Sequence, residues 1–429
     1  MTTTRTLPVD PLVASWGLAG LVLASLEFQY GLALHLGEFL ITLGGSDVGA
    51  YVRMSNFPSW RAALTFAGDR ALGFPLFLYV VRGVVGPSLT GMCWALFGFH
   101  LLSASVFYGA LRRRWGLHPA ALLLLFAFPG LVAYTTAPMT DAFAADLVML
   151  ALAAIVAERP MLAGAAWGWV VLVRPSTVVP AVLVLGLMVV QQRSIRSILA
   201  VLVFALILGW QGVNCWRMYQ TPCMVTPIYA ANTLGWGLNL GRTNVRIYFS
   251  QHMPKEEVLV SDPWLVARAA NAPLWLGPRL AWFMHHPDVL VVTVFKKTIA
   301  LLDNRTRSVD ERPGHAVDAT PRWYRWWARL WDAAACGGVA LALVWLWDRQ
   351  WTAIALVPLI HYLQQSPLHV PPRYGLTAVP CALVLLVWTV QQRRPVLLAV
   401  AVVAALAFYW QVSAWDQIDV ILQQIEGWA

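Results

Sequence analysis

Charged residues are scarce in this sequence. Only 12% of its 429 residues are Asp, Glu, Lys or Arg, whereas 59% are hydrophobic. A soluble globular domain usually carries about 25% charged residues, so this composition excludes an ordinary soluble protein. Apolar runs recur from one end of the chain to the other, and many approach the ~20 residues that cross a hydrocarbon core.

The apolar runs also lack the alternation of apolar and polar residues that is typical of a membrane β-barrel. Backbone N–H and C=O groups in lipid must bond within helices or closed barrels, so continuous runs predict helices. We therefore predict an all-α, polytopic helical membrane protein with about 11–12 transmembrane spans. No internal repeat is evident, which weighs against the many transporter folds that are built from repeats.

Cysteine is rare as well, and the five cysteines lack metal-ligand spacing. Cys215 and Cys223 could form a disulfide in an oxidising compartment, but we expect free thiols. The net charge of +9 does not indicate a nucleic-acid partner, because excess Lys and Arg in a membrane protein mark cytoplasmic loops. The apolar run after Arg5 is longer than the core of a signal peptide, so we expect a retained first span.

Four short basic clusters set the predicted orientation. They are 111–116, 191–196, 348–350 and 391–395, and all four should be cytoplasmic. The spans that fit them are 12–40, 88–111, 119–137, 142–157, 161–173, 175–190, 197–216, 331–347, 351–364, 374–390 and 395–412. Segment 71–87 is then a broken or interfacial helix on the outer side, and 287–302 is either interfacial or a further span.

This layout predicts three regions. Residues 1–216 form a transmembrane module with a first outer loop at 41–87. Residues 217–330 form a periplasmic or interfacial loop region, and residues 331–429 form C-terminal spans. The last segment, 411–429, has the pattern of an amphipathic outer helix, so we expect no large extramembrane domain after the last span.

Ionisable residues at or inside a membrane are costly and are therefore functional candidates. The predicted topology gathers on the outer side Asp47, Asp141, Arg174, His285, His286, Lys296, Lys297, Arg373 and Tyr374. Carboxylates can act as a base or hold a metal, and cations can stabilise a phosphate. Together these side chains suit a reaction on a lipid-linked phosphate ester.

Each candidate also has a structural interpretation. Asp47 and Asp141 could be helix N-caps, and Arg174 could extend to the headgroups. The two lysines could bind anionic lipid, and Arg373 could pair with Tyr374 at the interface. Glu27 and Glu38 are expected to bond with other helices of the bundle.

Six stretches carry a resemblance through their order along the chain. They are GSDVGAY, DRALGFPLFLYV, APMTDAFAADLVML, LVRPSTVVP, HHPDVLVVTVFKK and PPRYGLTAVPCALVLL. In this order they resemble the GT-C superfamily of integral-membrane glycosyltransferases, in particular its protein O-mannosyltransferase and lipid A aminoarabinose transferase group. The likeness covers most of the chain, although each motif alone is short. One departure is Val48, which follows Asp47 where several relatives carry a second acid.

The resemblance implies a seven-span catalytic module whose site faces the periplasm or exterior of a bacterial inner membrane. The donor would be a polyprenyl-phosphate-linked sugar, and the acceptor a hydroxyl of a lipid, glycan or protein. Asp47 would be the catalytic base, and Asp141 would share a divalent ion with it (Mg²⁺ or Mn²⁺) or orient the acceptor. The residues expected to bind the donor phosphate are Arg174, Lys296, Lys297, Arg373 and Tyr374; those expected to contact substrate are Tyr51, Arg70, His285 and His286.

Two other functions remain open. An O-antigen polymerase or ligase would depend on basic residues and His, with Arg242 and Arg246 prominent. A non-catalytic transporter of lipid-linked glycans would need a polar path at mid-membrane, whereas the acids, Glu27 apart, are expected to cluster at one surface. Membrane lipids are expected partners in every case.

Overall fold

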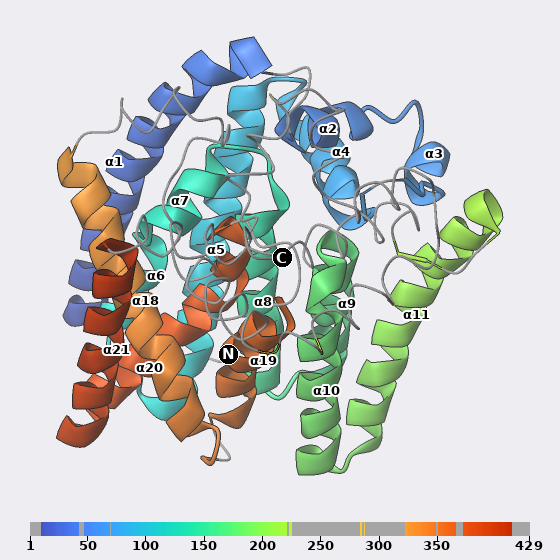
Figure 1. Ribbon diagram of the computed structural model, residues 1–429. Coiled ribbons are helices and arrows are strands. Elements are labelled where there is room, and N and C mark those ends of the chain that lie inside the picture. Colours follow the sequence, from blue (N-terminus) through green and yellow to red (C-terminus); the bar gives the residue numbers. More distant parts are fainter. Residues whose placement is uncertain are drawn as a thin grey trace, which may run out of the picture.

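The computed structural model describes residues 10–42, 47–68, 70–220, 223–224, 284, 287, 322–348, 351–365 and 372–413. Within these ranges the regular elements are all helical (Figure 1). They are α1 (Pro11–Thr42), α2 (Asp47–Met54), α3 (Trp60–Leu64), α4 (Gly73–Val85), α5 (Leu89–Trp115), α6 (Ala120–Phe126), α7 (Pro129–Thr135), α8 (Thr140–Val156), α9 (Pro160–Val173), η1 (Pro175–Thr177), α10 (Val178–Gln192), α11 (Ile195–Tyr219), α18 (Arg322–Trp345), α19 (Thr352–Gln365), η2 (Pro372–Ala378), α20 (Val379–Gln391) and α21 (Pro395–Ser413).

Several of these helices can cross a membrane. In the described part of the chain, five are long and apolar enough by length and composition: Pro11–Ala33, Leu89–Trp115, Pro175–Gln192, Ile195–Tyr219 and Trp327–Trp345. Shorter apolar helices of 10–17 residues occupy most of the other predicted spans. The prediction of a polytopic helical membrane protein is confirmed. However, the described helices that are long and apolar enough to cross a membrane are fewer than the 11–12 predicted spans.

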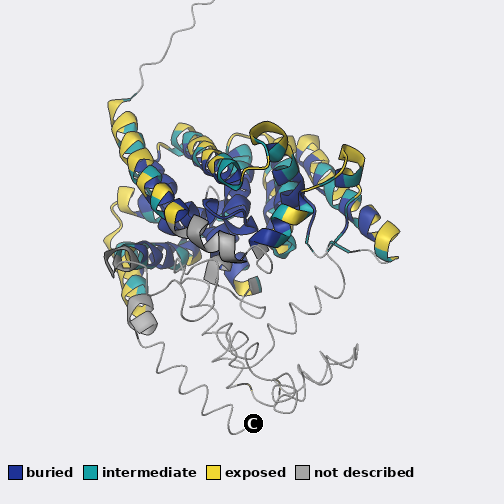
Figure 2. Cartoon of the chain, turned by 90° about the horizontal axis from the view of Figure 1, so that it is seen from above, coloured by how far each residue is buried: buried dark blue, intermediate teal, exposed yellow. Residues whose placement is uncertain are grey.

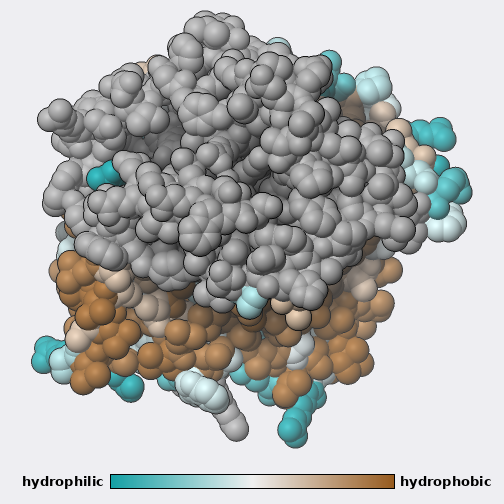
Figure 3. Space-filling view, in the orientation of Figure 1, coloured by the Kyte–Doolittle hydropathy of each residue, from teal (hydrophilic) through white to brown (hydrophobic). Residues whose placement is uncertain are grey.

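The surface of the bundle is suited to lipid. Leu202 and Leu206 of α11 and Val403 of α21 are more than half exposed, although all three are large and apolar. Seen from above, buried residues line the inner faces of the helices and exposed residues lie outside (Figure 2). Figure 3 shows a band of hydrophobic side chains with hydrophilic ones below it. An apolar belt of this kind is what a bilayer requires of the protein surface.

One predicted span is wrong in its detail. The segment 119–137 was expected to be one helix, but it consists of α6 and α7, separated at Ala127 and Phe128. Pro129 lacks an N–H donor and disfavours helical geometry in the residue before it, and Phe128 is accordingly extended. A second bend of 116° separates α7 from α8, and every residue of α7 is buried.

The described residues in and beside the basic clusters lie at one end of the bundle, which we call the basic end. Gln391, the last residue of α20, accepts a hydrogen bond from the His118 N–H at 3.0 Å and donates one to the Gly116 carbonyl at 3.0 Å. Arg114 and Arg193 line one pocket, and Arg394 lies 5.1 Å from the ring centre of Trp345. The structure thus places together the loops that were predicted to share the cytoplasmic side.

A disulfide lies toward the opposite end of α11. Cys215 pairs with Cys223 across a Cα–Cα distance of 5.5 Å, so the expectation of free thiols is wrong. The chain turns back after α11 because Gln220 adopts a left-handed conformation with φ 55°, and no Gly or Pro marks this turn before Pro222. Disulfides persist in oxidising compartments, and the side of the membrane that each end faces stays a prediction.

The orientation can be tested with single cysteines in a variant whose native cysteines are replaced. Asn56→Cys lies in the first loop and Arg113→Cys lies at the basic end; both positions are exposed. We expect a membrane-impermeant maleimide to label position 56 in intact cells and to label position 113 only after the membrane is opened. The reverse pattern would contradict the predicted orientation.

Candidate functional site

Three predicted site segments come together at the end opposite the basic end. Val48 of α2, Met139 and Ala142 around the start of α8, and Leu376 of η2 belong to one cluster of buried side chains. Along the sequence these residues lie next to, or two positions from, Asp47, Asp141 and the Arg373–Tyr374 pair. The side chains of Asp47, Arg373 and Tyr374 lie outside the described part of the chain; their backbones begin α2 and lie within η2. Segments more than 90 residues apart in sequence therefore share one site region.

A buried ion pair lies in this region. Arg174 donates from a terminal guanidinium nitrogen to Oδ1 of Asp141, and their side chains are 7% and 2% exposed. The interpretation of Arg174 as extending to the headgroups is therefore wrong. Asp141 is not the N-cap of α8 either, because that position is Met139. Asp141 lies in the first helical turn, where a negative charge is favourable to the helix dipole.

The sequence around Arg174 explains its position. Arg174 ends α9 in an extended conformation with φ −142° and ψ 91°, which the following Pro175 favours. The helix therefore stops at the arginine, and η1 and α10 turn back from it. The Arg-Pro break thus fixes the guanidinium at the junction of two helices.

The other two candidates with described side chains, Tyr51 and Arg70, belong to a row of aromatic contacts that reaches α8. The Arg70 guanidinium lies 5.8 Å from the centre of the Tyr51 ring. Tyr51 packs edge-on against Phe74 at 5.1 Å, and Phe74 lies 5.4 Å from Phe143, two residues after Asp141. This row links Tyr51 and Arg70 to Phe143 of α8 through ring contacts, and their role in contacting substrate stays a prediction.

Helix α11 holds the first loop in place. Trp210 and Asn214 both donate to the Leu64 carbonyl, at 2.9 and 2.8 Å. The Tyr219 hydroxyl donates to the Ala67 carbonyl at 3.3 Å. These bonds attach the segment after α3 to the end of α11 that carries the disulfide.

Gly73 allows α4 to approach the end of α9. A Cβ atom at Gly73 would lie 2.8 Å from both the Leu172 carbonyl carbon and the Val173 nitrogen. The Gly73→Ala variant should therefore lose about 1–3 kcal/mol of stability by overpacking. In the same helix, a Cβ at Gly83 would meet nothing within 4 Å, so Gly83→Ala should be neutral or stabilising by up to ~1 kcal/mol. Thermal unfolding in detergent measures both, and equal melting temperatures would contradict the close α4–α9 approach.

No family model matches the chain, and neither a curated protein nor a solved structure does. The resemblance to the GT-C superfamily therefore rests on the order of the motifs.

Four predicted residues cannot be placed. His285, His286, Lys296 and Lys297 lie outside the described residues, as does most of the possible span 287–302. The expected roles of the lysines at the donor phosphate and of the histidines at the substrate stay predictions.

Of the two predicted ligands of the divalent ion, only Asp141 has a described side chain, since that of Asp47 lies outside the described part of the chain. Among them, no group of three His, Cys, Asp or Glu side chains is close enough to hold a metal. The carboxylate of Asp141 instead bonds to a guanidinium, an unfavourable neighbour for a cation that prefers several oxygen ligands. Since the described side chains do not fit the ion, we assign it no step.

The sequence analysis missed a second buried pair. His100 Nδ1 of α5 lies 2.7 Å from Asp146 Oδ1 of α8, and their side chains are 0% and 1% exposed. Three buried atoms of this group, His100 Nε2, Asp146 Oδ2 and Ser103 Oγ, have no hydrogen-bond partner within the described residues. The expectation that the acids, Glu27 apart, cluster at one surface is therefore wrong. The signal was available, because both ionisable residues interrupt long apolar runs.

Glu27 is placed as expected. Its Oε1 accepts a hydrogen bond from the Trp327 indole at 2.7 Å, which joins α1 to α18. The side chain of Glu38 lies outside the described part of the chain.

Proposed function

We propose that this protein is a glycosyltransferase that moves a sugar from a polyprenyl-phosphate-linked donor to an acceptor hydroxyl on the outer face of the membrane. The observation that supports it best is the buried Asp141–Arg174 pair. Ala142, the residue after Asp141, packs in one cluster with Val48 and Leu376, which are close in sequence to Asp47 and to the Arg373–Tyr374 pair. Membrane proteins bury ionisable groups mainly at functional sites. Acidic and basic groups together suit the transfer of a group from a phosphate.

The proposed reaction is a single displacement. The lipid donor enters sideways from the outer leaflet, and Asp47 removes the proton of the acceptor hydroxyl. The acceptor oxygen then forms a bond to the anomeric carbon as the bond from that carbon to the phosphate oxygen breaks. Polyprenyl phosphate leaves with the bonding electrons, and Arg373, with Lys296 or Lys297, stabilises its charge.

The described contacts divide the roles of the two acids. Asp141 is bonded to Arg174, so the role of base falls to Asp47. Asp141 then acts as a positioning residue that fixes Arg174 at the end of α9. Tyr51 and Arg70 would contact the sugar or the acceptor from the first loop.

The donor-binding part of this proposal is tested by Arg373→Gln. A charge-assisted bond to the phosphate contributes about 1.5–3 kcal/mol, so the variant should bind a polyprenyl-phosphate sugar at least tenfold more weakly. Arg393→Gln is the matched control, because Arg393 lies beyond the far end of α20, at the basic end. Equal donor affinity in Arg373→Gln and wild type would remove Arg373 from the site.

One observation favours a second candidate, a transporter of lipid-linked glycans. The His100–Asp146 pair lies within two apolar helices, and such pairs occur along ion and proton paths of transporters. A transporter would carry the lipid-linked sugar across the bilayer without releasing polyprenyl phosphate. The two activities are therefore distinguishable in one reconstituted system.

A further inference from the structure

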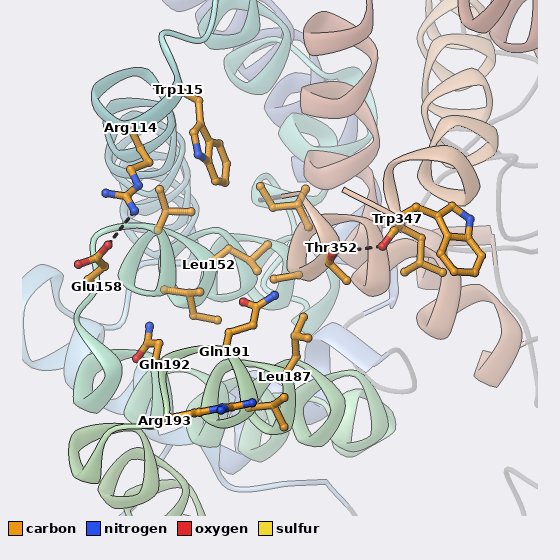
Figure 4. A pocket seen from close by; sticks show the side chains of 16 residues that line it. Arg114, Trp115, Leu152, Glu158, Leu187, Gln191, Gln192, Arg193, Trp347 and Thr352 are labelled. Atoms are coloured by element: carbon orange, nitrogen blue, oxygen red, sulfur yellow. Dashed lines mark hydrogen bonds and ion pairs between the residues drawn. The ribbon is translucent and has the colours of Figure 1, made fainter. Parts of the chain in front are cut away.

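A large pocket opens at the basic end, away from the proposed catalytic site. Its volume is about 870 Å³, and it lies between the ends of α5, α8 and α10 and the α18–α19 turn (Figure 4). Polar and charged side chains line part of it, including Arg114, Glu158, Gln192 and Arg193. Apolar side chains such as Leu152 and Leu187 form other parts of its wall. A pocket with this lining suits an amphiphile.

The charged groups of the pocket favour an anion. Arg114 and Glu158 form an ion pair at 2.8 Å, but their side chains are 57% and 64% exposed. Such an exposed pair is weak. Arg193 ends α10 in a left-handed conformation, with φ 47°, and also lines the pocket. Two arginines against one glutamate leave the lining with an excess of positive charge.

The position of the pocket identifies the source of the anion. Trp115 and Trp347 line it, and tryptophan is typical of the membrane–water interface. The apolar walls continue from the basic end into the helices that expose apolar side chains, among them Val190 of α10. A soluble phosphate would leave those walls exposed to water, whereas acyl chains would cover them.

We propose that this pocket binds one anionic phospholipid of the leaflet at the basic end. Its headgroup phosphate would bond to Arg193 and Arg114, and the upper parts of its acyl chains would lie against Leu152, Leu187 and Ile354. Basic pockets between transmembrane helices on the cytoplasmic side commonly hold such headgroups. This site does not depend on the proposed glycosyltransferase activity, because it lies at the other end of the bundle.

Native mass spectrometry of the purified full chain tests the proposal, with phosphatidylglycerol and phosphatidylcholine as probes. We expect phosphatidylglycerol to bind at least tenfold more tightly than phosphatidylcholine. Arg193→Gln should weaken phosphatidylglycerol binding about tenfold, since it removes a charge-assisted bond. Arg113→Gln is the matched control: Arg113 is exposed in the same basic cluster but does not line the pocket, so binding should not change.

Two further measurements decide between a lipid and other ligands. Ala353→Trp fills the pocket from α19 and should abolish selective binding without lowering the melting temperature. Glycerol 1-phosphate, which has the headgroup chemistry without acyl chains, should bind at least a hundredfold more weakly than the lipid. Wild-type affinity for phosphatidylglycerol in both Arg193→Gln and Ala353→Trp would overturn the proposal. Equal affinity for glycerol 1-phosphate and the lipid would overturn it as well.

Discussion

The Asp141→Leu variant should be less stable than wild type by about 3–5 kcal/mol, the usual cost of removing one partner of a buried ion pair. Asp141 and Arg174 are 2% and 7% exposed, so water compensates little for the charge that remains. Unfolding by denaturant in detergent micelles measures the loss. Replacing both partners, as Asp141→Leu with Arg174→Met, should restore much of the stability because no uncompensated charge remains.

The chain offers a control pair for this experiment. Asp10 bonds to Arg112 at the basic end, but these side chains are 40% and 32% exposed. Asp10→Asn should cost no more than about 1 kcal/mol, since exposed pairs contribute little and the amide oxygen still accepts the Leu12 N–H at the start of α1. The double variant could instead lose as much stability as the two single variants, Asp141→Leu and Arg174→Met, lose together. The two side chains would then not be coupled. That result would contradict the ion pair as described.

The Asp47→Asn variant should bind the lipid donor but transfer the sugar about 10²–10⁴-fold more slowly, which is the usual contribution of a general base. The amide keeps the shape of the side chain but cannot accept the proton of the acceptor hydroxyl. The test is the rate of polyprenyl-phosphate release at saturating donor, with donor binding measured separately. Asp10→Asn, a carboxylate-to-amide change at the basic end, should leave the rate unchanged.

If Asp47 only stabilises helix α2, its replacement should leave the rate of sugar transfer unchanged. Asp47 is the first residue of α2, and a carboxylate there could simply stabilise the helix dipole. If Asp47→Asn transfers sugar at the wild-type rate and only lowers stability, Asp47 is not the base. The proposed mechanism would then need a different base at the same end of the bundle.

Much of the helical layout could be predicted from the sequence. Predicted spans 161–173 and 197–216 correspond to α9 (Pro160–Val173) and α11 (Ile195–Tyr219). The length of an apolar run and the Pro and Arg residues at its ends are local features, so they can be read from a single sequence. The basic clusters were assigned to one side by their charge, and the number of crossings was then chosen to fit that assignment. The α6–α7 break was missed, although Pro129 was a visible signal for it.

The site could be predicted only as a set of residues at one end. Asp141 and Arg174 were both expected there, but their bond depends on how the start of α8 packs against the end of α9. Such packing depends on side chains from helices that are distant in sequence, such as Gly73 against Leu172 and Val173. The His100–Asp146 pair was not predicted for a different reason: the two residues lie in different spans, 46 positions apart, so their contact depends on how α5 packs against α8.

The central claim, that the end opposite the basic end carries out sugar transfer from a lipid-linked phosphate, is tested most directly in proteoliposomes containing the purified wild-type protein. A panel of polyprenyl-phosphate sugars would be supplied, and release of polyprenyl phosphate and movement of the intact donor across the bilayer would be followed together. We predict that one donor yields polyprenyl phosphate and a glycosylated acceptor. Donor that crosses the bilayer intact, with no polyprenyl phosphate formed from any member of the panel, would contradict the claim and favour the transporter.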